Sequence, residues 1–131
     1  MGAPSPSVVD VRVVRARDFL KTTVAGTLDF ERSRALLREA LMQSMPADGF
    51  DLLLDLRKST DVMSYKQIHL LIQEIKTTAP HFAQRVAVLE NWGSDLEKAQ
   101  FFEADARHEG YDVRAFHRFE AALDWLFAAR D

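Results

Sequence analysis

The sequence predicts a single α/β domain with the element order β-β-α-β-α-β-α-β-α. Two short apolar runs, Leu52–Leu56 and Val86–Leu89, have the composition of strands that are buried on both faces. The segment between them carries apolar residues at helical spacing, so strands and helices alternate along the chain. This alternation predicts a five-stranded, mostly parallel sheet with right-handed crossovers, in which only the first strand is antiparallel.

Length and composition restrict the class of protein. The 131 residues are 47% hydrophobic and 28% charged, which is typical of one globular domain. The chain contains 17 Lys and Arg against 20 Asp and Glu, so it lacks the basic excess that nucleic-acid binding requires. It has no cysteine, which excludes disulfides and thiolate metal sites and fits a cytoplasmic location. No apolar run approaches the ~20 residues of a transmembrane segment.

The first segment of the chain is expected to be a tail followed by a hairpin. Residues 1–7 are small, polar and interrupted by proline, which predicts a flexible N-terminal tail before an α/β domain over residues 8–131. Alternation over 8–16 predicts a half-exposed strand, residues 17–18 a turn, and 19–25 a second strand that ends at Gly26.

The next elements are a helix and the central strand. Asp29 is expected to cap the helix, and Pro46 and Gly49 to end it. The central strand then runs from Gly49 to Leu56. Its polar continuation, Arg57–Thr60, is predicted to be the loop that leaves the carboxyl end of the sheet.

Capping boxes mark the next two helices. Ser64 with Gln67, and Ser94 with Glu97, have the spacing of a serine cap and a side chain that reaches back to it. The second of these helices is expected to stop at Gly110. A solvated edge strand over 111–116 and a helix over 118–129 complete the domain.

In order and spacing, these elements resemble the STAS superfamily (sulphate transporter and anti-sigma factor antagonist), and more closely its bacterial STAS/CRAL-TRIO-like branch. The motifs that carry the resemblance are Val24–Gly26 before a capped helix, Leu52–Leu56, Arg85–Leu89, and Val113–Phe116 leading into Glu120–Leu126.

The resemblance implies a non-enzymatic binding or regulatory module that acts through a protein partner or a small ligand. The alternative that it implies is a carrier of a small apolar, lipid-like ligand, as in CRAL-TRIO domains. In anti-sigma factor antagonists, a serine that opens the helix after the third strand is the phosphorylated switch. Ser64 lies close to that place, but no acidic residue precedes it and no glycine follows it. The other interpretation of its hydroxyl is a helix cap, a position at which serine is strongly preferred.

No pattern of residues predicts catalysis, a cofactor or a metal site, so a small enzyme is the third alternative. The sequence has no Gly-x-Ser-x-Gly elbow and no glycine-rich phosphate loop. Its histidines, His69, His81, His108 and His117, have no metal-ligand spacing. Asp55 has the position of a phospho-acceptor in receiver domains, but the acidic residues and the lysine that such a site requires are not in place, so binding of loop amides is the other interpretation.

The predicted functional crevice lies where two neighbouring parallel strands end, since the loops leaving their carboxyl ends converge there. Hydroxyl, amide and aromatic groups in these loops favour binding over proton transfer. For Trp92 there are two interpretations, a wall of this crevice shared with Tyr65 or a lid on the core. The predicted crevice residues are Ser59, Thr60, Asp61, Ser64, Tyr65, Asn91 and Trp92.

Two apolar residues fall off the buried stripes of their helices. Leu70 and Phe101 lie on successive crossover helices and could share an exposed patch. Chance placement and a weak homodimer interface both explain them.

Overall fold

The computed structural model describes residues 9–15, 19–45 and 49–129. Its sheet has five strands in the order β1-β2-β3-β4-β5. β1 pairs antiparallel with β2, and every later pair is parallel. The strands are β1 (Asp10–Arg15), β2 (Phe19–Leu28), β3 (Asp51–Asp61), β4 (Arg85–Leu89) and β5 (Asp112–Phe116). The predicted architecture is therefore confirmed, including the antiparallel edge strand.

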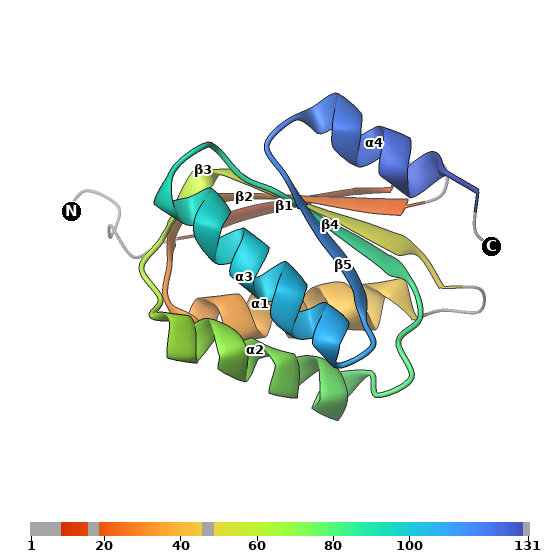
Figure 1. The fold of residues 1–131 in the computed structure, drawn as a ribbon, viewed down its shortest axis with the longest axis horizontal. Helices are drawn as coiled ribbons and strands as arrows, with labels where there is room; N and C mark the ends of the chain where they lie inside the picture. The colour runs from red at the N-terminus through yellow and green to blue at the C-terminus, as the bar shows by residue number, and fades with distance from the viewer. Residues whose placement is uncertain (1–8, 16–18, 46–48, 130–131) are drawn as a thin grey trace, which may run out of the picture.

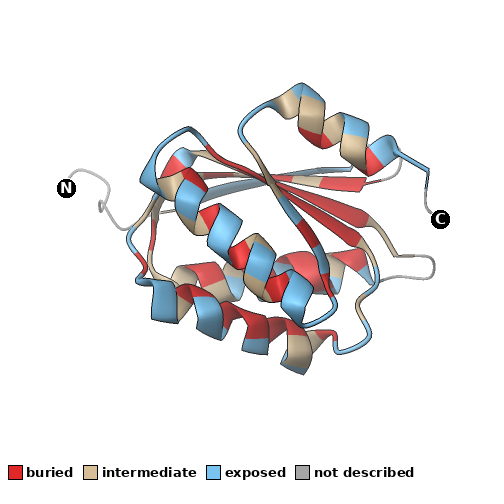
Figure 2. Cartoon of the chain, viewed as in Figure 1, coloured by how far each residue is buried: buried red, intermediate tan, exposed pale blue. Residues whose placement is uncertain are grey.

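Helices cover the sheet unequally on its two faces. α1 (Phe30–Ser44), α2 (Tyr65–Thr78) and α3 (Ser94–His108) lie on one face, and α4 (Phe119–Phe127) lies on the other (Figure 1). The alternation of side chains along β3 divides the core accordingly, since Leu52 and Leu54 pack beneath the three helices whereas Leu53 packs beneath α4. Buried residues consequently line the inner sides of all three crossover helices and the middle of the sheet (Figure 2).

The central strand is longer than the sequence predicted. β3 continues through Arg57–Thr60, the segment expected to be a loop, and ends at Asp61. The pairing shows why: Thr23 of β2 lies opposite Asp55 but Ala25 lies opposite Lys58, so β3 carries an extra residue at this step. Beyond this bulge, β2 itself continues past Gly26 to Leu28 and pairs with the polar end of β3.

The first strand also differs from the expectation. All six residues of β1 are exposed, so it is not the half-exposed strand that its alternation indicated. It lies at the edge of the sheet, next to β2 alone. The predicted tail at 1–7, the turn at 17–18 and the stop at Pro46 lie outside the described residues.

Candidate functional site

Two crossovers meet at the carboxyl edge of the sheet. β3 ends at Asp61 and leads to α2, and β4 ends at Leu89 and leads to α3. Since β3 and β4 are parallel neighbours, the N-termini of α2 and α3 lie at the same edge (Figure 1). We refer to this edge, with its two connecting segments, as the carboxyl edge.

Ser64 caps α2 as predicted. Its hydroxyl accepts a hydrogen bond from the Gln67 amide at 3.1 Å, and the Gln67 side chain accepts one from the Ser64 amide at 3.0 Å. This reciprocal pair satisfies two amides that the first turn of a helix leaves free. The Ser64 side chain is therefore exposed but already has a structural role.

The second predicted capping box does not form. α3 begins at Ser94 itself, and its N-cap is Gly93, which makes no side-chain capping bond. Gly93 has a φ of 116°, a conformation that a residue with a Cβ rarely adopts. The sharp backbone turn after β4 thus moves Ser94 out of the capping position and into the helix.

The remaining polar residues of the third-strand segment have distinct environments. Ser59 is buried within β3, and its hydroxyl donates to the Leu56 carbonyl at 2.7 Å. Thr60 is an exposed strand residue. Asp61 accepts a hydrogen bond from the Met63 amide at 2.7 Å, and Lys98 of α3 donates to the Asp61 carbonyl at 3.1 Å. Asp61 and Lys98 thereby tie the end of β3 to α3.

The aromatic residues form two separate pairs. The ring of Tyr65 packs edge-on against Phe101 of α3, with centroids 5.1 Å apart. The ring of Trp92 packs against His117, which follows β5, with centroids 4.2 Å apart. Trp92 is 76% exposed, so the interpretation of this residue as a lid on the core is wrong.

Asn91 and Leu70 complete the predicted set. The Asn91 side chain donates a hydrogen bond to the Arg57 carbonyl at 2.7 Å, which joins the segment after β4 to the C-terminal half of β3. Leu70 on α2 is 39% exposed and Phe101 on α3 is 37% exposed. The contact of Phe101 with Tyr65 places it at the carboxyl edge.

Asp55 is held by its neighbour in the strand. The Arg57 guanidinium donates to both carboxylate oxygens, at 2.9 and 2.8 Å, and the Arg57 amide donates at 3.2 Å. Burial alone would raise the pKa of Asp55, but these hydrogen bonds hold it below its usual value. Asp55 therefore forms a local ion pair with Arg57 and accepts a hydrogen bond from one backbone amide within β3, so its contacts are not the loop amides that the sequence interpretation expected.

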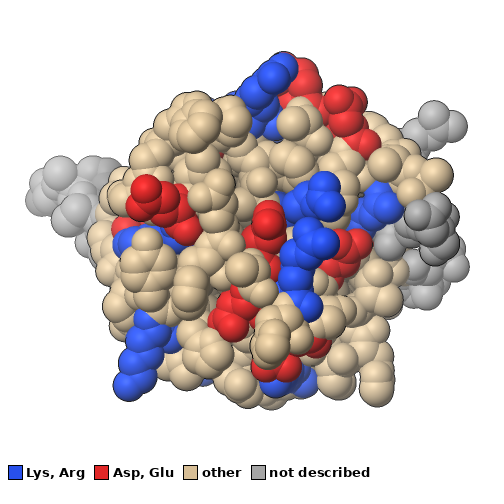
Figure 3. All heavy atoms as spheres, viewed as in Figure 1, with Lys and Arg blue, Asp and Glu red and all other residues tan. Residues whose placement is uncertain are grey.

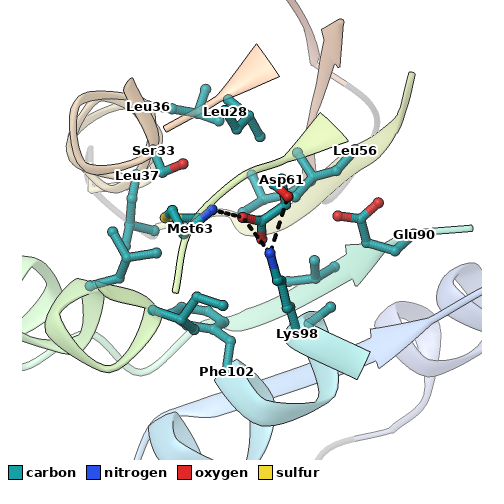
Figure 4. Close-up of a pocket in the computed structure, with 15 residues that line it drawn as sticks. Leu28, Ser33, Leu36, Leu37, Leu56, Asp61, Met63, Glu90, Lys98 and Phe102 are labelled. Carbon is teal, nitrogen blue, oxygen red and sulfur yellow. Dashed lines mark hydrogen bonds and ion pairs between the residues drawn. The ribbon is translucent and has the colours of Figure 1, made fainter. Parts of the chain in front are cut away.

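A cavity of about 70 Å³ lies between the sheet and the three crossover helices (Figure 4). We call it the inner cavity. Most of its lining is apolar. The lining residues are Leu28, Ser33, Leu36, Leu37, Leu54, Leu56, Asp61, Met63, Ile68, Leu71, Val88, Glu90, Lys98, Ala99 and Phe102.

Glu90 lies at the carboxyl edge but was not predicted from the sequence to be a functional residue. It directly follows β4 and is only 2% exposed, and one carboxyl oxygen, Oε1, has no hydrogen-bond partner among the described residues. Burial, and then the negative charges of Asp95, Asp61 and Asp55, raise the pKa of Glu90 to about 8. The sequence signal for it is a carboxyl group that directly follows the apolar run Val86–Leu89.

Within the described ranges, no group of three or more His, Asp or Glu side chains is placed to hold a metal ion. None of the helices in the same part of the chain is long and apolar enough to cross a bilayer. On the face shown in Figure 3, basic and acidic side chains are interspersed.

No family model matches the sequence, and no curated protein matches it. Solved structures do match. An anti-sigma factor antagonist from Mycobacterium paratuberculosis superposes with a TM-score of 0.66 at 12% identity, over 96% of this chain and 100% of that one. An uncharacterised protein of the DUF3478 family with a SpoIIAA-like fold, from Shewanella loihica, gives 0.57 at 19% identity, over 96% and 98%. The chain therefore has the SpoIIAA-like fold, as its resemblance to the STAS superfamily predicted.

Proposed function

We propose that the protein is a non-enzymatic regulatory module that binds a protein partner through its carboxyl edge. The observation that carries this proposal is that Trp92 is 76% exposed. Tryptophan is among the residue types that contribute most to the binding energy of protein interfaces. The ring of Trp92 packs against the ring of His117. An aromatic side chain that is both exposed and positioned loses little conformational entropy when a partner covers it.

Further apolar side chains extend the same edge. Val62 and Tyr65, on either side of Ser64, are exposed, and Tyr65 contacts exposed Phe101. An exposed apolar patch with polar residues around it is the usual composition of a protein-binding site. The fold of an anti-sigma factor antagonist supports the proposal by analogy, because that class of protein acts by binding another protein.

The contacts of Asp55 and Asp61 favour binding over catalysis. Asp55 is paired with Arg57, and Asp61 with Lys98. Catalytic carboxylates are instead arranged to face a substrate. A cytoplasmic location belongs to the same proposal and is consistent with the lack of cysteine in the sequence.

Replacement of single exposed side chains tests the partner site. Affinity-tagged protein recovered from its source cells should carry a second polypeptide in native mass spectrometry. Trp92→Ala and Tyr65→Ala should each reduce the amount of that polypeptide, with circular-dichroism spectra like that of the wild type. Met42→Ala, at an exposed position of α1, is the matched control and should retain it. Equal recovery with all three variants would contradict the proposal.

A carrier of a small apolar ligand is the second candidate. The inner cavity favours it, since its lining is mostly aliphatic and lies beneath the carboxyl edge rather than on it.

A further inference from the structure

The inner cavity has the construction of a small binding site. Its walls come from both layers of the domain, with Leu54 and Val88 from the sheet and Leu37, Ile68 and Phe102 from the three crossover helices. Its volume of about 70 Å³ is far below the several hundred Å³ of pockets for drug-sized molecules. A molecule enclosed in it would have only a few non-hydrogen atoms.

Among the residues that line this apolar space, two have a buried polar atom without a hydrogen-bond partner in the described part of the chain. These atoms are Glu90 Oε1 and Ser33 Oγ, in residues that are 2% and 6% exposed. Figure 4 shows the Glu90 carboxyl directed toward Asp61 and Lys98, and the Ser33 hydroxyl projecting from α1 on the opposite side. A buried polar group without a partner destabilises the fold, so each marks a position where a hydrogen-bonding ligand would be favoured.

The charges that face Glu90 determine which ligand fits. β3 contributes Asp61, which pairs with Lys98 of α3, and Asp55, which pairs with Arg57. α3 also contributes Asp95, whose negative charge disfavours ionisation of Glu90. With a pKa of about 8, Glu90 carries its proton at pH 7 and can donate a hydrogen bond. The charged or ionisable residues that line the cavity itself are Asp61 with its partner Lys98 and the protonated Glu90, so the lining carries no net charge.

We propose that the inner cavity binds a small neutral aliphatic molecule whose carbonyl oxygen accepts a hydrogen bond from the buried carboxyl group of Glu90, whose Oε1 has no hydrogen-bond partner among the described residues. The aliphatic part would contact the leucines and Val88, and a neutral ligand avoids the cost of burying a charge. Lys98 stays bound to Asp61 and need not move.

The pH dependence of binding distinguishes this ligand class from a cation. A carbonyl group can only accept a hydrogen bond, so binding requires protonated Glu90. Since that form falls to about a tenth of the molecules at pH 9 for a pKa of about 8, affinity should drop about tenfold between pH 6.5 and pH 9. An alkylammonium ion requires ionised Glu90, and its affinity would rise over the same interval.

A titration of the wild-type protein with 2-butanone, followed by the NMR signals of methyl groups, tests the proposal. At pH 6.5 the methyl signals of Leu54, Met63 and Val88 should shift saturably, and at pH 9 the dissociation constant should be about tenfold higher. Parallel titrations use n-butylammonium at the same two pH values. Shifts that do not saturate at pH 6.5 would mean that water alone fills the cavity. That result, or tighter binding of n-butylammonium, would overturn the proposal.

Variants identify the donor and the cavity. Glu90→Gln keeps an N–H donor but cannot ionise, so 2-butanone should bind equally at both pH values. Glu97→Gln, the same change at an exposed position of α3, should keep the tenfold dependence. Ala99→Leu fills the cavity from α3 without changing Glu90, and should abolish the saturable shifts in a folded protein. Unchanged binding to Ala99→Leu would place the ligand elsewhere. None of these readouts involves the partner surface at Trp92.

Discussion

Glu90 should make the stability of the protein fall as the pH rises. Its pKa is 4.5 when exposed to water and about 8 in the folded protein. Below pH 4.5 both the folded and the unfolded chain keep the proton, and the group does not affect the free energy of unfolding. Between pH 4.5 and 8 the unfolded chain releases the proton while the folded chain holds it, so unfolding becomes easier with every step in pH.

The magnitude follows from the interval between the two pKa values. Each pH unit in this window lowers the free energy of unfolding by about 1.4 kcal/mol. From pH 4.5 to pH 8 the loss is on the order of 5 kcal/mol, a large share of the 5–15 kcal/mol that is typical of whole domains. Above pH 8 both states are ionised and the loss stays constant.

Urea unfolding of the wild type and of Glu90→Gln between pH 4.5 and pH 9 measures this effect. Titrating groups that do not interact with Glu90 act alike in the two proteins, so the difference between their free energies of unfolding reports on Glu90 and the carboxylates coupled to it. That difference should move in favour of the glutamine variant as the pH rises, and level off above pH 8. A difference that stays constant over the whole interval would refute the assignment of Glu90 as a buried acid.

Three further predictions concern the helices. Ser64→Ala should cost about 1 kcal/mol in urea unfolding because the amide of Gln67 loses its cap, whereas Ser64→Asp should recover most of it; no loss with Ser64→Ala would contradict the cap. Arg85→Met should lower the free energy of unfolding by about 2 kcal/mol and speed amide hydrogen exchange in α4, because buried Arg85 donates hydrogen bonds to the carbonyls of Trp125 and Ala128. Amide exchange in α4 at the wild-type rate would contradict this. If the protein self-associates weakly through Leu70 and Phe101, its mass in light scattering should rise with concentration, and the variant with both Leu70→Ser and Phe101→Ser should not show this rise. A wild-type protein that stays monomeric at high concentration would contradict the prediction.

Features fixed by nearby residues could be predicted from the sequence. The cap of α2 depends on contacts between Ser64 and Gln67, three positions apart, and forms as expected. The order of strands follows from the strict alternation of apolar runs and helices, and it is also confirmed.

Features that depend on distant segments could not be predicted in this way. The extension of β3 to Asp61 requires Ala25–Leu28 of β2 beside it and a bulge that restores the pairing. The contact of Trp92 with His117 joins the connection between β4 and α3 to the connection between β5 and α4. Glu90 is followed by loop residues, and only the packing of three helices over the sheet shows that it is buried.

The structure places some residues of the predicted crevice on the surface and others in the interior. Tyr65 and Trp92 lie on the surface, each beside a different ring, while Ser59 is buried inside the sheet. Asp61 belongs to both parts, because it ends β3 at the carboxyl edge and also lines the inner cavity. Whether these residues bind anything stays a prediction.

Photo-crosslinking from position 92 in the source cells tests the proposed partner surface most directly. A photoreactive amino acid in place of Trp92 should join the protein to one partner polypeptide. The same amino acid in place of Phe127, which is 55% exposed on α4, should not, because α4 ends beside Arg85 at the start of β4 whereas Trp92 follows the end of that strand. A specific adduct at position 92 alone is the result that we expect. Equal crosslinking at both positions, or an adduct at position 127 alone, would contradict a binding site at the carboxyl edge.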